Sequence, residues 1–417
     1  MDLRVHERPI TKPNIDLERE RICLRRKRRV LAIFAILLLY GVIAFSIMYF
    51  FSNNQVKVYP NGLGQESPMA LHVVGNRVVT GEGVDLILHG VDYTYFIDDP
   101  YGSWMLPSGD IEYSVWDTTA LAANLDAIKS WGFNSIRILA TTQWWAQNSG
   151  DFQSHLEYFI KEAASRKIYV DFTFWRNNGL EGQPSLPYPP YDDGNGVIKS
   201  ENAFVNLWAS VSVALKSYPN VLFELWNEPN GDKEAQNSWF NVTQKCIDAI
   251  RDTGASNIIV LQWDYNTYLD FRNYSELSDS YDSKFSEMST SLHDSRNNII
   301  YSTHLYSTGF YDSSNGYSLK YSYSDMLWAL NVTGLLSFSS KYPVWIGEIG
   351  CSLWASNIND EYAWYNNTLS ILNQNDIGYC GWAWAPWSTG TQWELVTRQS
   401  NYVPSEAGKI LQQRICG

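Results

Sequence analysis

Apolar and polar positions along the chain alternate between short β-prone runs and longer segments of helical spacing. In the helical segments apolar residues recur three and four positions apart, as at Leu121, Leu125 and Ile128, and Gly132 follows as a stop signal. Such patterns lie near residues 117–131, 152–166, 202–217, 238–252, 324–340 and 360–375. The strand-like runs are residues 85–93, 135–139, 168–174, 221–226, 258–262, 299–304, 344–348 and 378–384. Eight strands alternating with helices predict an α/β fold, a parallel (β/α)8 TIM barrel.

Four segments stand outside this repeat. Residues 73–79 predict a short hairpin that forms the barrel floor. Residues 263–298 are polar and rich in aromatic residues, with little helical pattern. The segments 93–116 and 177–195 follow predicted strands and combine polar residues with aromatic rings. Because loops after the strands build the active-site face of such a barrel, we expect these rings to wall a groove.

The N-terminal residues carry the pattern of a membrane anchor. Ten Lys and Arg against five Asp and Glu give residues 1–29 a net charge of +5, and residues 30–51 carry no charge. As a helix, residues 30–51 would be about 33 Å long, enough for a hydrocarbon core of about 30 Å. The basic flank predicts an uncleaved signal anchor in the cell membrane, with the N-terminus in the cytoplasm and the rest outside. A cleaved signal peptide is the alternative, and a buried core helix is a third interpretation.

This anchor divides the chain into four parts. They are a basic head over residues 1–29, a transmembrane helix over 30–51, a polar stalk over 52–70 and a barrel domain over 71–417. The whole chain has a net charge of −13, so the residues beyond 29 carry −18, since +5 − 18 = −13. So acidic a body argues against nucleic acid and polyanionic ligands. We expect a monomer that binds a neutral ligand with faces for aromatic stacking.

Cysteine and histidine spacing gives no sign of a metal site. The sequence contains no CxxC or HxxxH pattern, so we expect no zinc. Four of the five cysteines lie beyond the apolar run and could pair in three ways: Cys246, Cys351, Cys380 and Cys416. A bridge between Cys351 and Cys380 is disfavoured, because one should lie above its strand and the other deep in the next. Disulfide pairing stays open.

Two glutamates at the ends of apolar runs are the candidate catalytic residues. Glu228 follows the run that begins at Val221, and Pro229 behind it cannot extend a strand. Glu348 ends a second apolar run, 120 positions later. Each alone could be a salt-bridged strand end. Two glutamates at the carboxyl ends of barrel strands are what a two-carboxylate glycosidase requires, so together they predict catalysis.

The same residues carry a family resemblance. Leu-Trp-Asn-Glu-Pro at 225–229 and Gly-Glu-Ile-Gly at 347–350 resemble the acid/base and nucleophile motifs of glycoside hydrolase family five, the cellulase and mannanase group. The resemblance covers about residue 71 to the C-terminus, and its first motif is the more specific. It implies a (β/α)8 barrel and retention of anomeric configuration.

Alternation along strands and the resemblance together assign further site residues. Arg137 should point into the barrel, where a charge needs a carboxylate partner, and the resemblance places it against Glu348. His304 and Tyr306 share one strand face and match the family's His-x-Tyr pair, which holds the sugar and the nucleophile. A structural ion pair for Arg137 and a core role for His304 are the alternatives.

Two more substrate-binding residues follow from the same patterns. Trp384, the last residue of its predicted strand, is assigned as the platform beneath the sugar, and Trp382 to the core. Asn227 is assigned to the sugar's 2-hydroxyl, although strict alternation would turn it away from Glu228 unless the chain bends there. The chain departs from the family pattern at Asp92, where Asn is common, and in residues 171–176, which lack a common His.

The predicted reaction is a two-step hydrolysis in which Glu348 attacks and Glu228 acts as acid and then base. It requires no metal or organic cofactor. We expect a β-linked polysaccharide substrate, β-1,4-glucan first and mannan or another β-glycan next. A membrane-bound transglycosylase and a non-catalytic glycan-binding barrel are the two alternatives. Intact Glu228 and Glu348 argue against the second.

Overall fold

The computed structural model describes ten stretches of the chain, all within a compact unit over Pro60–Gly417. They are residues 67, 69–97, 99–147, 149–175, 196–229, 233–262, 287–307, 321–351, 357–385 and 394–416. The predicted anchor over 30–51 lies outside them, as does most of the stalk. Within the described stretches, no helix combines the length and apolarity that a membrane crossing needs.

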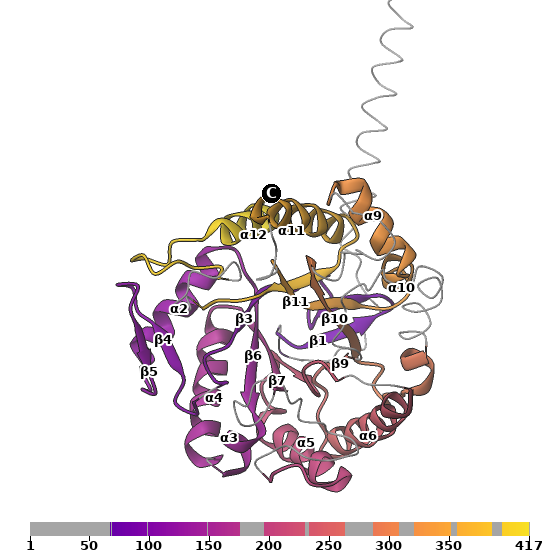
Figure 1. Ribbon diagram of the computed structural model, residues 1–417. Coiled ribbons are helices and arrows are strands. Elements are labelled where there is room, and N and C mark those ends of the chain that lie inside the picture. Colours follow the sequence, from indigo (N-terminus) through magenta and orange to yellow (C-terminus); the bar gives the residue numbers. More distant parts are fainter. Residues whose placement is uncertain are drawn as a thin grey trace, which may run out of the picture. The chain divides into compact units, whose positions relative to one another are not determined.

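Eight parallel strands close into a barrel, as the alternation predicts (Figure 1). Around the barrel they follow the order β10-β11-β12-β3-β6-β7-β8-β9. Their bounds are β3 (His89–Tyr93), β6 (Ser135–Thr141), β7 (Tyr169–Trp175), β8 (Val221–Glu224), β9 (Ile259–Gln262), β10 (Ile299–Tyr306), β11 (Val344–Gly350) and β12 (Gly378–Gly381). Sequence neighbours pair with one another throughout, which is the connectivity of a (β/α)8 TIM barrel.

Helices surround the barrel (Figure 1). They are α2 (Thr118–Ser130), α3 (Thr142–Gln147), α4 (Ser149–Ser165), α5 (Glu201–Leu215), α6 (Lys233–Asp252), α9 (Tyr323–Val332), α10 (Leu335–Ser339), α11 (Ile358–Gln374) and α12 (Glu406–Cys416). The single helical pattern over 324–340 forms two helices, α9 and α10, because Gly334 between them has a φ of +76° and stops the first. The helices α3 and α12 were not predicted.

Two antiparallel hairpins flank the barrel. The first pairs β1 (Leu71–Val74) with β2 (Arg77–Thr80) and confirms the predicted hairpin. The second pairs β4 (Ser103–Met105) with β5 (Ile111–Tyr113), within a segment predicted as an open loop. Tyr95, Phe96 and Trp104 of that segment are buried in the core, so these three rings do not wall a groove. The other predicted groove segment, 177–195, lies outside the described residues.

The barrel interior has an apolar floor and a polar upper half. The floor cluster consists of Leu71, Leu88, Tyr169, Leu222, Ile258, Val260, Ile300, Trp345 and Cys380, with Val73 and Val78 of the first hairpin packed against it. Two residues further along β7 and β8, Asp171 and Glu224 replace apolar side chains. Because residues two apart share a face, β7 and β8 carry both layers. Cys246, Cys351 and Cys380 are buried free thiols.

Candidate active site

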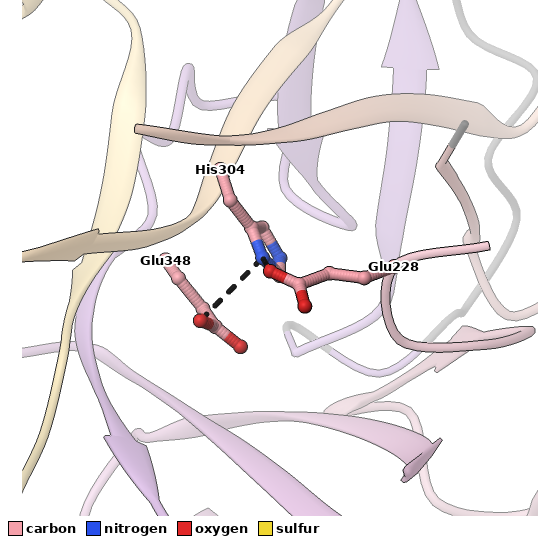
Figure 2. Close-up of side chains that lie close together, drawn as sticks. All are labelled: Glu228, His304 and Glu348. Carbon is pink, nitrogen blue, oxygen red and sulfur yellow. Dashed lines mark hydrogen bonds and ion pairs between the residues drawn. The ribbon is translucent and has the colours of Figure 1, made fainter. Parts of the chain in front are cut away.

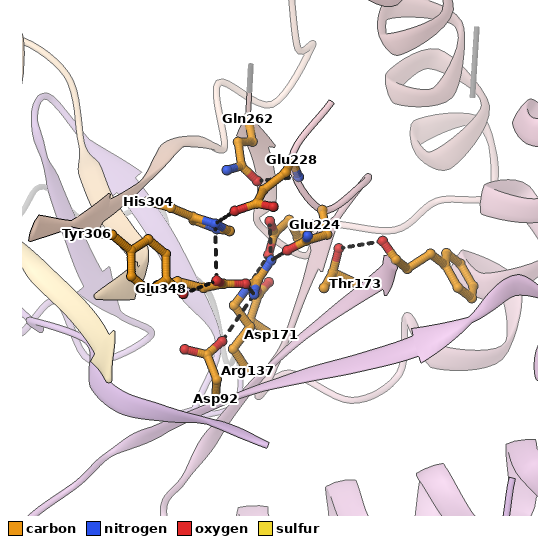
Figure 3. Close-up of polar contacts among 12 residues, drawn as sticks. Asp92, Arg137, Asp171, Thr173, Glu224, Glu228, Gln262, His304, Tyr306 and Glu348 are labelled. Carbon is orange, nitrogen blue, oxygen red and sulfur yellow. Dashed lines mark hydrogen bonds and ion pairs between the residues drawn. The ribbon is translucent and has the colours of Figure 1, made fainter. Parts of the chain in front are cut away.

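Arg137 is the centre of the polar half (Figure 3). Its side chain is fully buried, and each of its five N–H bonds has an acceptor. Nε and Nη2 donate to the two oxygens of Glu224 at 2.6 and 2.9 Å, and Nη2 also donates to Asn227 Oδ1 at 2.7 Å. Nη1 donates to Glu348 Oε1 at 2.8 Å and to Asp92 Oδ1 at 3.1 Å. The expected contact between Arg137 and Glu348 is therefore present.

Glu348 reaches the barrel interior because β11 contains a bulge. Trp345 on this strand faces the floor, so strict alternation would turn Gly347 inward instead of Glu348. The pairing with β10 shifts by one residue just before His304, which brings His304 opposite Glu348. Only glycine fits at 347 without movement, since a Cβ there would lie 2.8 Å from Ser302 Oγ and 3.0 Å from His304 Nε2.

Three neighbours face the carboxylate of Glu348. Arg137 donates to one oxygen, and the Tyr306 hydroxyl donates to the other at 2.5 Å. His304 Nδ1 lies 3.5 Å from that second oxygen. Burial raises the pKa of Glu348 above its usual value, and the charge of Glu228 acts in the same direction, while the three neighbours oppose the rise. These donors are what favours an ionised nucleophile in a dry site.

Glu228 lies above Glu348 on the more open side of the site. Its side chain is 25% exposed, against 6% for Glu348. Its carboxylate lies 2.7 Å from His304 Nδ1, and its backbone N–H donates to Gln262 Oε1 at 3.1 Å. The more exposed carboxyl is the better placed of the two to meet a leaving group and then a water molecule.

A bend after β8 directs Asn227 and Glu228 to the same site. The strand ends at Glu224, and Glu228 has a φ of +53°, in the left-handed region. The bend that the assignment of Asn227 required is therefore present. Because Oδ1 of Asn227 accepts from Arg137, the amide nitrogen is the atom left to serve a ligand.

His304 is buried and connects the two glutamates. Burial lowers its pKa to about 4, so the imidazole is neutral near pH 7. Its Nδ1 faces only carboxylate oxygens at these short distances, so Nδ1 carries the proton. Within the described residues, Nε2 has no hydrogen-bond partner. A neutral donor at Nδ1 aligns Glu228 without adding charge.

The three side chains converge on one point (Figure 2). One oxygen of Glu228, one oxygen of Glu348 and one nitrogen of His304 all lie within 4.8 Å of one another. Retaining glycosidases hold their carboxyl groups about 5–5.5 Å apart, and inverting ones about 6.5–9.5 Å. Two carboxylate oxygens this close leave less room between the carboxyls than the inverting arrangement requires, and favour the retaining one. In the described part of the chain, these three groups also offer the arrangement that could hold a metal ion.

The structure contradicts the assignment of Trp384 as a platform for the sugar. Strand β12 ends at Gly381, so the alternation used for the assignment does not reach Trp384. Its side chain is fully buried, its Nε1 donates to Asn124 of α2 at 3.0 Å, and its ring contacts Trp131 at 4.8 Å between centroids. Trp384 is a core residue between the barrel and its helices.

Trp382, predicted to be a core residue, lies beside the site instead. It is only partly buried. A Cβ built on Gly350 would lie 3.3 Å from the Cβ of Trp382 and 3.2 Å from the Tyr306 ring. Trp382 and Tyr306 therefore flank the same glycine at the end of β11, two residues beyond Glu348.

Sequence reasoning missed two buried acids, Asp171 and Glu224. Burial acts to raise the pKa of Glu224, but the charge and hydrogen bonds of Arg137 outweigh it and lower that pKa. Burial raises the pKa of Asp171, whose Oδ2 lies 3.7 Å from Arg137 Nε. Alternation from the floor residues Tyr169 and Leu222 would have placed both acids inside the barrel.

A curated relative is similar over most of this chain. A mannan endo-1,4-beta-mannosidase of Cellvibrio japonicus is 21% identical over 317 residues, which cover 75% of this chain and 59% of the mannosidase. The chain thus spans about three fifths of that relative's length.

Solved structures of the same fold include a glucanase and a mannanase. An endo-beta-1,4-glucanase of Xanthomonas axonopodis pv. citri matches with a TM-score of 0.58 at 19% identity, covering 79% of this chain and 99% of the glucanase. A beta-mannanase of Streptomyces thermolilacinus with mannohexaose matches with a TM-score of 0.55 at 16% identity, covering 84% and 94%. The family model described as cellulase, glycosyl hydrolase family 5, matches residues 101–388. The chain, with two facing glutamates in a parallel barrel, belongs to glycosyl hydrolase family 5.

Proposed function

We propose that this chain is a retaining glycosidase that hydrolyses a neutral β-linked polysaccharide. The observation that carries the proposal is that one carboxylate oxygen of Glu228 lies within 4.8 Å of one carboxylate oxygen of Glu348, at the carboxyl end of the barrel. Glu348 attacks the anomeric carbon while protonated Glu228 gives its proton to the leaving oxygen, and the glycosidic bond breaks. Glu228 then takes a proton from water, which attacks the glycosyl-enzyme and releases Glu348.

The neighbours of the two glutamates have separate roles in these steps. Arg137 and Tyr306 hold the carboxylate of Glu348 and favour its ionised form. His304 aligns Glu228 through Nδ1. Asn227, fixed through its oxygen by Arg137, offers its amide nitrogen to the 2-hydroxyl of the sugar, a contact that strengthens in the transition state.

For the substrate we propose β-1,4-glucan first and β-1,4-mannan second. Glucanases and mannanases both appear among the structures of this fold, and the matched curated relative is a mannosidase. The net charge of −13 disfavours polyanionic polymers. The departures from the family pattern at Asp92 and in residues 171–176 do not select between the two sugars.

Reducing-sugar release tests the proposal. The full-length protein and its Glu348→Ala variant are assayed on carboxymethylcellulose, glucomannan, xylan and β-1,3-glucan. We expect release from the first or second, and its loss in the variant. Glu406→Ala is the matched control, because this glutamate is about half exposed on α12 and should leave release unchanged.

The configuration and length of the first products separate the remaining mechanisms. Retention requires that the newly formed reducing end is β, which proton NMR records before mutarotation. An α product would overturn the roles of Glu228 and Glu348. Oligosaccharides longer than the substrate would show transglycosylation by the same carboxylates, and folded protein that binds glycans without turnover would show a binding barrel.

We propose further that residues 30–51 anchor the enzyme in the cell membrane with residues 71–417 outside. The support is the uncharged run and its basic flank, with a head over 1–29 and a stalk over 52–70. Protease added to intact cells should then remove the barrel domain and leave the head protected. Recovery of the full-length protein in the soluble fraction would contradict the anchor.

A further inference from the structure

The polar half of the barrel holds more acid than one arginine can neutralise. Four carboxyl groups lie within 4 Å of Arg137, and their side chains are 0–6% exposed: Asp92, Asp171, Glu224 and Glu348. If all were ionised, the cluster would carry a net charge of −3. An uncompensated charge in a dry interior costs several kcal/mol, so a buried acid without enough donors binds a proton instead.

The hydrogen bonds show which acids are the protonated ones. Glu224 accepts two bonds from Arg137, and Glu348 accepts from Arg137 and from Tyr306. Asp92 accepts a single, longer bond of 3.1 Å, and its Oδ2 is buried without a hydrogen-bond partner within the described residues. These contacts leave Glu224 and Glu348 as the ionised pair and Asp92 as a neutral acid.

Asp171 is the second neutral acid by the same reasoning. Neither of its oxygens receives a hydrogen bond from a described donor, and Arg137 Nε is 3.7 Å away. Its Oδ2 and Oε2 of Glu224 both face Arg137 Nε, at 3.7 and 2.6 Å, and two carboxyls so placed attract one another only when one of them holds a proton. Two protons on Asp92 and Asp171 reduce the net charge of the cluster from −3 to −1.

The electrostatic surroundings of Asp92 agree with this assignment. Burial raises its pKa well above the usual value, and the charges of Glu348 and Glu224 act in the same direction, against Arg137. The titratable groups that face it come from every neighbouring strand and from α11: Arg137, Asp171, Glu224, Tyr306, Glu348, Cys380 and Tyr365. Arg137 is the only cation in that set.

We propose that Asp92 is a positioning residue that works as a neutral carboxylic acid, and that its ionisation at alkaline pH draws Nη1 of Arg137 away from Glu348. Nη1 is the arm that serves both acids, at 3.1 and 2.8 Å. While Asp92 is neutral, it accepts its bond without competing for the positive charge. Once ionised, Asp92 places a second negative charge beside Nη1 of Arg137 and repels the carboxylate of Glu348. The proposal rests on the nucleophilic role of Glu348 but not on the identity of the sugar.

A pH profile of kcat/KM tests the proposal. The substrate is a dinitrophenyl β-cellobioside, or the β-mannobioside if that is preferred, because so good a leaving group needs no proton from Glu228. The fall in kcat/KM at alkaline pH that deprotonation of Glu228 would cause is then absent, because the attack of Glu348 no longer depends on that proton. We expect the full-length enzyme still to lose kcat/KM at alkaline pH in proportion to one proton, and Asp92→Asn to lack that fall, because the amide oxygen accepts the same bond and cannot ionise.

Asp171→Asn is the matched control. It replaces the other neutral acid of the cluster, but Asp171 lies at the Nε side of Arg137 and does not share Nη1 with Glu348. The alkaline fall should therefore persist in this variant. An identical fall in the parent and Asp92→Asn would overturn the proposal, and so would a parent without any fall before it unfolds.

Infrared spectroscopy tests the proton itself without any substrate. At neutral pH the parent should show the carbonyl stretch of a protonated carboxylic acid, and a difference spectrum against Asp92→Asn should assign it. Absence of this band overturns the proposal even if the enzyme is active. Its presence in a protein that cleaves no glycan would refute the proposed hydrolysis alone. If Asp92→Asn does not fold, the parent's carboxylic-acid absorption, to which Asp171 and protonated Glu228 also contribute, should still lose one component with the same pH dependence as kcat/KM, and absorption without such a component would overturn the proposal.

Discussion

The two halves of the barrel interior are built on the same strands and follow opposite chemistry. Near the floor, Leu222, Val260 and Trp345 pack as an ordinary apolar core. A few ångströms further along, Arg137 and the acids around it fill the same space with charge. Side-chain alternation places both the apolar floor residues and the charged residues inside the barrel. The strands alone therefore do not determine which half of the interior carries the chemistry.

The two halves of the barrel interior differ in how well they tolerate a substitution. In the floor each contact is weak and many neighbours share the loss of one methyl group. In the polar half every donor of Arg137 is used, so the loss of one group leaves a buried charge without its counterpart. We therefore expect the floor to govern stability and the polar half to govern both stability and rate.

The largest effect is expected for Arg137→Met. The change leaves Glu224 and Glu348 buried without a counter-charge, which costs about 3–5 kcal/mol. Glu348 would also take up a proton and lose its nucleophilicity, so activity should vanish. Urea unfolding and the polysaccharide assay measure the two losses. A variant of native stability and activity would show that the acids do not depend on this arginine.

Leu222→Ala comes next and tests the floor. Deletion of a buried leucine side chain leaves a cavity, and about 2–5 kcal/mol of unfolding free energy should be lost. Because Leu222 lies two residues before Glu224 on β8, below the reacting groups, kcat/KM of the folded fraction should stay near that of the parent. A matching fall in kcat/KM would mean that the two halves are not separable.

Gly347→Ala is expected to have an intermediate effect at the boundary. Its Cβ would lie 2.8 Å from Ser302 Oγ and 3.0 Å from His304 Nε2, so the imidazole must move. Overpacking of this kind costs about 1–3 kcal/mol. We expect kcat to fall more than KM rises, because His304 aligns Glu228. Equal stability and kcat in the variant would show that the bulge is not needed.

The last expected effect is a change in the slope of stability against pH, not in stability at a single pH. The folded-state pKa of Asp171 is raised, so the native state holds a proton that the unfolded state releases above about pH 4. Stability from this proton is complete at lower pH and is lost as pH rises towards the folded pKa, by at most about 1.4 kcal/mol per unit. In Asp171→Asn unfolding should therefore depend less steeply on pH, as guanidinium titrations at several pH values would record.

Period-two patterning predicted most of the fold, and the motifs at two strand ends predicted the two glutamates. Some of the remaining site residues could not be placed from the sequence, because alternation fails where a strand ends or bulges. The sequence predicts that strand β12 continues to Trp384, but the strand stops at Gly381. Trp384 is therefore a core residue, and Trp382 lies beside the site. The bulge at Gly347 likewise breaks the alternation of β11, and only the motif pointed to Glu348. Asp171 and Glu224 follow simple alternation and were missed because no motif drew attention to them.

The full use of the donors of Arg137 has a consequence for how this site can change. None of its five N–H bonds is left for a sugar, so the orientation of the nucleophile is set before any ligand arrives and needs no rearrangement during reaction. Recognition of the polymer must then come from residues around this centre. Substitutions around this centre can change which glycan is bound, while Arg137 and the carboxylates that it holds stay unchanged.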